Sequence, residues 1–203
     1  MVSPARQSAA DSIESADQRV FLHNVSWAQY QRLLDLRGEE PGPRMTYLEG
    51  ELELMSPSQD HESIKKLIAR LLEAYALAKG IELNGYGSMT MKSRPRERGA
   101  EPDECYAIGA AKKHADIAIE VIWTHGGLDK LAVYKGLKVR EVWLYRKGNL
   151  EVYTLRRGAY IRIAGSEVLP KLDLAQLVRH VGEANQTAAV RRYLKALRSR
   201  RRG

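Results

Sequence analysis

The chain has 203 residues, of which 44% are hydrophobic and 29% charged, with a formal net charge of +8 at pH 7. A chain of this size buries a sizeable core as one domain. It has no apolar run near the ~18 residues that a membrane helix needs and no signal-peptide core at its start. Its single cysteine excludes an internal disulfide framework and a cysteine-based zinc site. We therefore expect a cytoplasmic enzyme or binding module that does not contact membranes.

The positive charge is concentrated near the C-terminal end. Residues 191–202 carry seven arginines and lysines and no acid, so the rest of the chain, at +8 less 7, is close to neutral. A basic helix there could bind phosphate backbones, and a solvated, frayed terminus is an equal alternative. We divide the chain into a disordered start (1–18), a single domain (19–182) and a basic C-terminal helix and tail (183–203).

Two helices in the first half have clear boundary signals. Ser26 can cap a helix that Gly38 ends, and Ser58 can cap a longer helix that Gly80 ends. Apolar residues recur at helical spacing within both segments, so each helix is expected to bury one face.

Between these helices, Arg44–Met55 is typical of a hairpin that turns at Glu49-Gly50. Pairing about this turn divides the side chains between two faces. One face carries Met45, Tyr47, Leu52 and Leu54, and the other carries Thr46, Glu51 and Glu53.

The second half alternates short apolar runs with turn residues and contains no internal repeat. The strands that we expect are Ile81–Met91, Glu101–Ile108, Ala115–Trp123, Val139–Tyr145, Leu150–Leu155 and Ala159–Ile163. The helices that we expect run from Gly126-Gly127 to Tyr134, from a cap at Asp173 to Val181, and over Ala184–Arg198. This pattern predicts a mixed sheet flanked by helices, of the α/β or α+β class.

The strand expected at Ala115–Trp123 contains acids among β-branched residues. With a side-chain period of two, Asp116, Glu120 and Ile122 share one face of this strand. A carboxylate inside a buried strand is costly unless it is paired or bound to a cation. Oxygen-rich clusters suit Mg²⁺, which is often held by one or two carboxylates together with substrate phosphates.

An ordered series of motifs identifies a family resemblance. The motifs are M-T-Y-L-E-G-E-L-E-L-M-S-P-S-x-x-H-E, N-G-Y-G-S-M-T, E-P-D-E-C-Y, D-I-A-I-E-V-I-W, G-L-D-K-L-x-V-Y and V-R-E-V-W, which span roughly Met45–Trp143. They resemble the Uma-two family, a bacterial branch of the PD-(D/E)XK (restriction-endonuclease-like) nuclease superfamily. The resemblance implies the restriction-endonuclease-like core and a Mg²⁺-dependent endonuclease that acts on DNA.

The resemblance assigns the candidate catalytic residues. Asp103 and Glu120 would bind Mg²⁺, or Mn²⁺, and Lys130 would orient a water or stabilise charge. The alternatives are a solvated turn acid for Asp103 and an arginine partner for Glu120. The superfamily lysine normally stands two residues after the glutamate, where this chain has Ile122. Lys130, from the next helix, could return its ammonium to the same pocket, and its alternative is a solvent-facing lysine.

Three further residues are weaker candidates for the same site. Asp116 shares a face with Glu120 but lies near the strand end, so it could equally be an edge residue. His61 and Glu62 open the long helix, whose start the resemblance places beside the site. Glu62 could reach a metal through a water, and the alternative is simply a favourable interaction with the helix dipole.

Substrate contacts are expected from a basic cluster that directly precedes Asp103 in the sequence. The cluster consists of Lys92, Arg94, Arg96 and Arg98. We recognise no helix-turn-helix or other element that reads a DNA sequence. The sequence leaves open whether the protein forms a homodimer. The alternative function is a catalytically weak binding module that keeps the nuclease fold, motivated by Ile122. Convergence of Asp103, Glu120 and Lys130 in one pocket would favour the enzyme.

Overall fold

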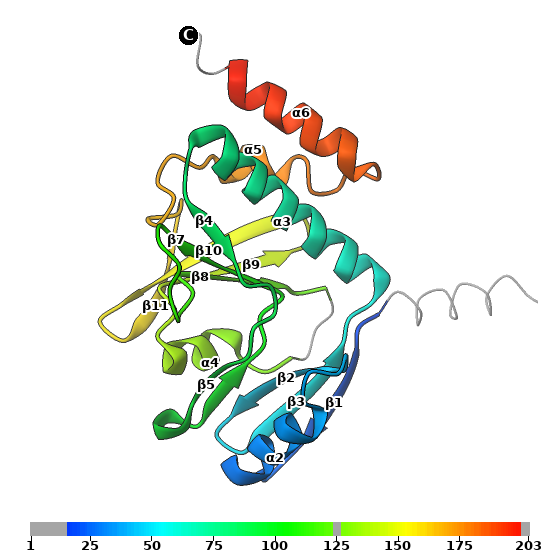
Figure 1. Cartoon of the computed structure of the whole chain (residues 1–203), viewed down its shortest axis with the longest axis vertical. Helices are drawn as coiled ribbons and strands as arrows, with labels where there is room; N and C mark the ends of the chain where they lie inside the picture. Colours follow the sequence, from blue (N-terminus) through cyan, green and yellow to red (C-terminus); the bar gives the residue numbers. More distant parts are fainter. Residues whose placement is uncertain (1–15, 124–126, 200–203) are drawn as a thin grey trace, which may run out of the picture.

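The computed structural model of the protein describes residues 16–123 and 127–199, which form two sheets and the helices around them (Figure 1). A five-stranded sheet has the order β1 (Gln18–Leu22), β3 (Glu51–Ser56), β2 (Arg44–Leu48), β6 (Arg98–Ala100) and β5 (Met91–Ser93). A six-stranded sheet has the order β11 (Ala159–Ile163), β10 (Asn149–Arg156), β9 (Glu141–Arg146), β8 (Ile117–Val121), β7 (Glu104–Ile108) and β4 (Leu83–Gly85). The strands β8 and β9 are parallel and the other described pairs are antiparallel.

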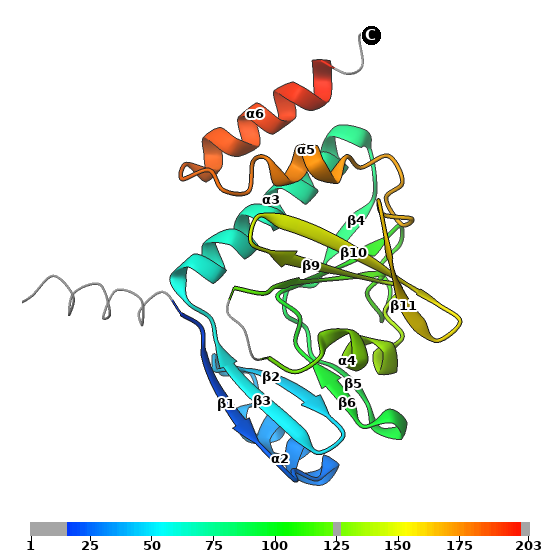
Figure 2. The same ribbon diagram turned by 180° about the vertical axis from the view of Figure 1, so that it is seen from behind.

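Helices cover both faces of the six-stranded sheet. The described helices are α2 (Trp27–Arg37), α3 (Gln59–Lys79), α4 (Lys130–Leu137), α5 (Leu174–Val178) and α6 (Gln186–Ser199), with a 3-10 turn η1 (Arg94–Arg96). Figure 1 and the reverse view in Figure 2 place α3, α5 and α6 on one side of this sheet, and α4 between it and the five-stranded sheet. The predicted α+β class is confirmed, although the strands divide into two sheets instead of one. No helix in the described ranges is long and apolar enough to cross a membrane.

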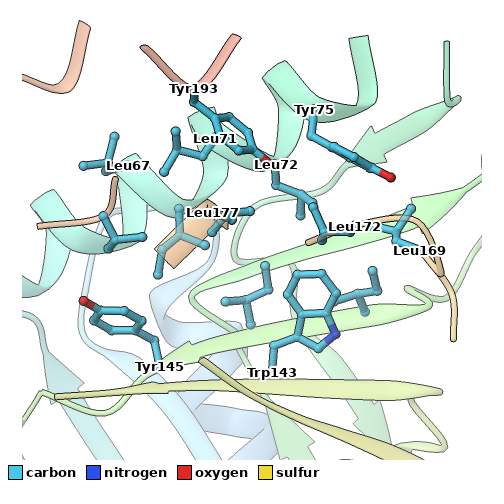
Figure 3. Close-up of a cluster of buried hydrophobic side chains, with 14 of the residues drawn as sticks. Leu67, Leu71, Leu72, Tyr75, Trp143, Tyr145, Leu169, Leu172, Leu177 and Tyr193 are labelled. Atoms are coloured by element: carbon cyan, nitrogen blue, oxygen red, sulfur yellow. The ribbon is translucent and has the colours of Figure 1, made fainter. Parts of the chain in front are cut away.

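The main core lies between the six-stranded sheet and α3. Alternate residues of β8, Ile117, Ile119 and Val121, join this core, while Ala118 packs on the α4 side. The predicted alternation of β8 is therefore confirmed, and it turns Glu120 toward α4. Figure 3 shows Trp143 and Tyr145 of the sheet beneath the apolar side chains of the helices.

Local signals set the helix boundaries as expected in the first half of the chain. Ser26 caps α2, with Gln29 completing a capping box, and Ser58 accepts a hydrogen bond from the His61 amide at the start of α3. Gly80 ends α3 in the left-handed conformation.

The hairpin register is also as predicted. Thr46 pairs with Glu53, and Tyr47 pairs with Leu52. Thr46 and Glu53 are both buried even though they lie on the polar face. This face is therefore turned toward other protein groups, and not toward solvent.

Several predicted boundaries are wrong. The expected strand Ile81–Met91 is two short strands in different sheets, because Gly87 turns the chain with a φ of 55°. The helix α4 begins at Lys130, since the Asp129 side chain accepts hydrogen bonds from two amides of the first turn; Gly126 lies outside the described residues. The strand expected from Glu101 begins at Glu104, and the helix expected to reach Val181 ends at Val178.

The two ends of the described chain are integral to the fold. Residues 16–18 belong to the segment expected to be disordered, yet Asp17 is buried and Gln18 begins β1, so the prediction is wrong there. Residues 1–15 lie outside the described part. At the other end, α6 buries Ala189, Tyr193 and Leu197 in the main core. Its basic residues are exposed on the opposite face.

Glu101 joins the five-stranded sheet to α2. Its carboxylate forms an ion pair with Arg37 and accepts hydrogen bonds from the Met45 amide at 2.8 Å and the Thr90 hydroxyl at 2.7 Å. Burial raises the pKa of Glu101, but these hydrogen bonds outweigh burial and leave the pKa below its ordinary value of 4.5. The acid that opens the E-P-D motif is therefore a structural residue.

We predict that Glu101→Gln lowers the free energy of unfolding by about 2–4 kcal/mol at neutral pH, because Arg37 loses its carboxylate partner. A carboxyl group with a lowered folded-state pKa stabilises the protein above its ordinary pKa, and this stabilisation is lost as the pH falls through the lowered value. Urea unfolding should therefore show a difference between the two proteins that shrinks in acid. A constant difference at all pH values would contradict the charge-based explanation.

Candidate functional site

Asp103 and Glu120 lie on neighbouring strands of the six-stranded sheet. The register pairs Glu104 with Ile119, and its extension by one residue places Asp103 opposite Glu120. The Asp103 Oδ2 atom accepts a hydrogen bond of 2.6 Å from the Val121 amide. Asp103 is 1% exposed and Glu120 is 2% exposed, so two carboxylates are brought together in a buried position.

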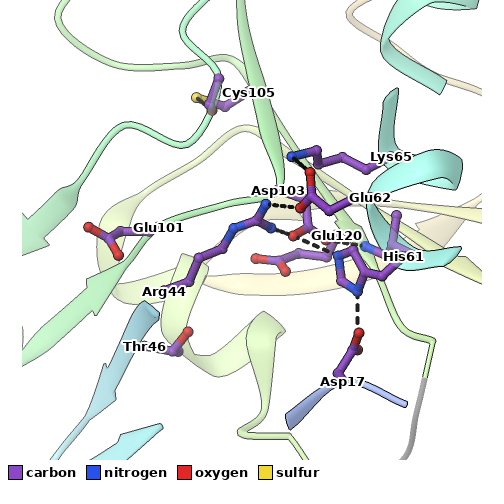
Figure 4. Close-up of polar contacts among 12 residues, drawn as sticks. Asp17, Arg44, Thr46, His61, Glu62, Lys65, Glu101, Asp103, Cys105 and Glu120 are labelled. Atoms are coloured by element: carbon purple, nitrogen blue, oxygen red, sulfur yellow. Dashed lines mark hydrogen bonds and ion pairs between the residues drawn. The ribbon is translucent and has the colours of Figure 1, made fainter. Parts of the chain in front are cut away.

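The other oxygen of Asp103 faces two basic side chains. Asp103 Oδ1 forms an ion pair with Arg44 of β2 and lies 3.0 Å from His61 Nε2 of α3. Figure 4 shows Arg44 reaching between Asp103 and Glu62, and His61 lying between Asp103 and Asp17. Within the described ranges, the facing atoms Asp103 Oδ1, His61 Nε2 and Arg44 Nη1 are buried and make no hydrogen bond of good geometry. These three atoms face one another, so the Asp103 carboxylate is compensated by close ion pairs.

Lys130 enters the same pocket from the first turn of α4. Its Nζ atom lies 3.4 Å from Glu120 Oε2 and donates a hydrogen bond of 2.9 Å to the Thr46 hydroxyl. One turn along α4, the Tyr134 hydroxyl donates to the other oxygen of Glu120. Burial first, and then the Glu120 charge, raise the pKa of Tyr134 well above its ordinary value, so this hydroxyl stays protonated.

A second layer of charged groups holds His61. Asp17 Oδ2 lies 3.1 Å from His61 Nδ1, and the other oxygen of Asp17 accepts a hydrogen bond of 3.0 Å from the Ser58 amide. Arg19 forms a third contact with Asp17, at 3.0 Å. Burial raises the pKa of Asp17, but the contacts with His61 and Ser58 outweigh it and the net pKa is lowered. Asp17 is therefore a carboxylate that fixes the imidazole.

Glu53 holds the segment that leads into α4. Its carboxylate is 1% exposed, lies 3.0 Å from Arg19 Nε and accepts a hydrogen bond of 2.8 Å from the Leu128 amide. This bond ties the approach to Lys130 to the five-stranded sheet. Sequence reasoning identified Glu53 only as a polar hairpin residue and did not identify Arg19 or Asp17.

The weaker candidates separate into two groups. His61 is in the site, and Glu62 is on its half-exposed rim, where it pairs with Arg44 at 2.7 Å and with Lys65 at 2.5 Å. Asp116 is outside the site, as the alternative of an edge residue had it. It lies at the other end of β8 from Glu120 and accepts hydrogen bonds from the Ile108 amide and the Lys112 ammonium. Asp116 closes the connection between β7 and β8.

The expected basic cluster is not next to the acids. Lys92, Arg94, Arg96 and Arg98 lie in the β5–β6 hairpin. Arg98 pairs with Leu48 in the sheet register and with Glu49 by an ion pair, so the hairpin tip lies by the β2–β3 turn. Arg44, which contacts Asp103, is at the opposite end of β2. The strand β6 thus lies between the basic cluster and Asp103 and separates them along the sheet.

Open space adjoins Lys130 at the start of α4. A cavity of about 320 Å³ is lined by Lys130, Arg19, Glu53, Arg146 and Tyr153. The cavity has a charged lining and room for a polar ligand. Lys130 connects it to Glu120, although neither Glu120 nor Asp103 lines it.

The donor set has the chemistry of a site for a hard divalent cation. Asp103 and Glu120 supply carboxylate oxygens from adjacent strands, and Mg²⁺ commonly takes one or two protein carboxylates and completes its shell with water and phosphate oxygens. No group of three or more His, Cys, Asp or Glu ligands occurs in the described ranges. Asp103 and Glu120 are thus the two described acids that could hold such an ion, which would take most of its ligands from water or a substrate and would compete with Arg44 and Lys130 for their oxygens.

We predict that Asp17→Asn lowers the free energy of unfolding by about 1–3 kcal/mol, because His61 and Arg19 lose a charged partner in a buried setting. Asp60→Asn is the matched control, since Asp60 is exposed in the first turn of α3. Denaturant unfolding of both variants measures the difference. Equal effects of the two substitutions would show that Asp17 contributes only surface charge.

Comparison with known proteins gives one finding that bears on this site. The family model Uma2, described as "Putative restriction endonuclease", matches residues 27–182, which is more than half of the chain. No curated protein matches the chain. The matched segment contains Asp103, Glu120 and Lys130, whereas Asp17 and Arg19 precede it.

Proposed function

Because the chain belongs to the Uma2 family, whose description is that of a restriction endonuclease, we propose that it is a Mg²⁺-dependent endonuclease that hydrolyses phosphodiester bonds in DNA. The observation that carries this proposal is the meeting of two buried carboxylates, Asp103 and Glu120, with the ammonium of Lys130. Buried acids have to be paired with a basic group or bound to a cation. Lys130 pairs with Glu120, and a metal ion would neutralise both acids.

Asp103 and Glu120 would hold Mg²⁺, and Mn²⁺ could take its place. The bound ion polarises a phosphoryl oxygen and lowers the pKa of a water molecule. The Val121 amide fixes one oxygen of Asp103, and the Tyr134 hydroxyl fixes one oxygen of Glu120. The second oxygens, Asp103 Oδ1 and Glu120 Oε2, face Arg44 and Lys130, so a bound Mg²⁺ would take the place of these basic side chains as their partner.

Lys130 would act on the reacting groups. Thr46 and Glu120 hold its ammonium, and Lys130 also lines the open cavity. From there the ammonium could orient a water molecule or stabilise the negative charge that develops on the phosphoryl oxygens. The helix α4 thus offers a replacement for the lysine that the superfamily pattern expects at Ile122.

Arg44 and His61 complete the charge balance around Asp103. Arg44 bridges Asp103 and the half-exposed Glu62, so its guanidinium reaches the rim of the site. A guanidinium suits the bidentate binding of phosphate, and we propose that Arg44 contacts the DNA backbone next to the scissile group. His61 is fully buried between two aspartates and would position Asp103.

One observation favours a second candidate function. Asp103 and Glu120 already have cationic protein partners, Arg44 and Lys130. A protein that keeps the nuclease fold but only binds nucleic acid would also need such internal neutralisation. The two functions differ in whether DNA is cleaved when a divalent ion is supplied.

We predict that the protein cleaves supercoiled and linear DNA with Mg²⁺ or Mn²⁺, and not with a chelator. Lys130→Ala should slow cleavage by about 10²–10³-fold, the effect typical of losing one group that stabilises transition-state charge, while Mg²⁺ still raises the melting temperature. Glu120→Gln should abolish both cleavage and this stabilisation. It should also destabilise the metal-free protein, because Lys130 loses its partner.

Matched substitutions control for general effects on the fold. Lys135→Ala changes an exposed lysine of the same helix, and Asp116→Asn changes an acid of the same sheet that lies away from Glu120. Both variants should cleave at the wild-type rate. Full Mg²⁺-dependent cleavage by Glu120→Gln would show that the proposed site is in the wrong place. DNA binding without any cleavage would favour the second function.

We also predict that α6 contributes to DNA affinity. Its exposed basic residues include Arg191, Lys195 and Arg198. Truncation would remove buried core residues of α6, so neutral substitution is the better test. The triple change to glutamine should reduce the slope of log K against log salt by about 0.9 for each phosphate that the helix no longer neutralises. An unchanged slope would identify the helix face as solvated surface.

A further inference from the structure

A second cavity lies at the opposite end of α4 from Lys130. It has a volume of about 440 Å³ and is formed by the β5–β6 hairpin, the loop that precedes β8 and the residues that end α4. Five of its lining residues are basic, namely Lys92, Arg96, Lys113, His114 and Lys138. No aspartate or glutamate lines it. We call this cavity the basic groove.

The lysine and arginine side chains of the basic groove lack acidic partners among the described residues. No ion pair joins Lys92, Arg96, Lys113 or Lys138 to an acid within the ranges that the structure describes. All four side chains are exposed. Their neighbours behave differently, because Lys112 is paired with Asp116 and Arg98 is paired with Glu49.

Such an arrangement attracts anions. Four like charges from three separate segments surround one concavity, and a cleft lined by one sign of charge concentrates counter-ions. The floor includes the buried residues Ala115 and Val139, and Ser93 adds a hydroxyl group to the wall. The volume is within the usual range of ligand sites.

The groove is separate from the candidate catalytic site. His114 and Ala115 lie before β8 and precede Glu120 by six and five residues, which in an extended chain is up to about 16–20 Å. Along α4, Lys138 follows Lys130 by eight residues, which at helical rise is about 12 Å. A ligand in the groove therefore does not occupy the position of the scissile phosphate.

We propose that the basic groove binds the phosphate groups of a nucleic-acid backbone and anchors it at a distance from the site of cleavage. The identity of the phosphate carrier rests on the proposed function, whereas the affinity for phosphate rests on the groove alone. Lysine and arginine are the side chains that contact backbone phosphates most often, and such contacts are independent of sequence.

The test is a triple variant, Lys92→Gln, Lys113→Gln and Lys138→Gln, with a matched control of the same charge change. The control replaces Lys147, Arg157 and Lys171 with glutamine; these residues are exposed and lie outside the lining of the groove. Binding of a fluorescent DNA duplex is measured by anisotropy in chelator, so that no cleavage occurs. Binding of pyrophosphate is measured by calorimetry, and melting temperatures establish that each variant is folded.

The groove variant should bind the duplex more weakly than the control does. Its slope of log K against log salt should fall by about 0.9 for each phosphate that is no longer neutralised, and by up to about 2.7 for three phosphates. Unchanged duplex binding overturns the proposal. If pyrophosphate binding alone is lost, the groove holds a free phosphorylated molecule and not nucleic acid. Because the measurements exclude divalent ions, a failure of the cleavage proposal would leave this result unaffected.

Discussion

The carboxylate of Asp103 is the point at which three parts of the fold meet. One oxygen accepts a hydrogen bond from the Val121 amide of the adjacent strand, and the other faces Arg44 of the five-stranded sheet and His61 of α3. An unpaired carboxylate in this buried position would be strongly destabilising. The need to neutralise this carboxylate therefore constrains how the five-stranded sheet and the start of α3 lie against the six-stranded sheet. This arrangement in turn creates the pocket that Lys130 enters.

Charge compensation extends outward from this point through chains of contacts. Arg19 joins Asp17 to Glu53, and Glu53 holds the segment before α4. The carboxylates of this region thus alternate with basic side chains from different elements. In a network of this kind each group orients the next, so the geometry around Asp103 and Glu120 depends on residues that could not touch a substrate.

The elements predicted correctly from the sequence are those with local signals. Ser26, Ser58 and Gly80 mark helix ends through contacts within one turn, and the hairpin register follows from its own alternation. The same logic placed Glu120 inside a buried strand. The family motifs then supplied Asp103 and Lys130, and the packing of α4 brings Lys130 to Glu120 despite the aliphatic Ile122.

The parts that sequence reasoning missed depend on contacts between distant segments. Asp17 precedes His61 by 44 positions, and no periodicity links them. In the sequence, Arg44 and Glu53 look like ordinary hairpin residues. Their roles follow only from contacts with distant segments, Arg44 with Asp103 and Glu53 with the Leu128 amide. Proximity in sequence was also misleading, since Arg96 and Asp103 are near neighbours in the chain but lie toward opposite ends of β2.

The strand β1 lies at the edge of its sheet and is hydrogen-bonded there only to β3 among the described strands. A short strand paired on one side only can open in local unfolding at a free energy below that of the whole domain. Opening of β1 would withdraw Asp17 from His61 and Arg19 from Glu53 while the main core stayed folded. The order of the pocket around Asp103 and Glu120 is thus coupled to the local opening of one short strand, and hydrogen exchange at β1 would report how often that pocket is disassembled in the native protein.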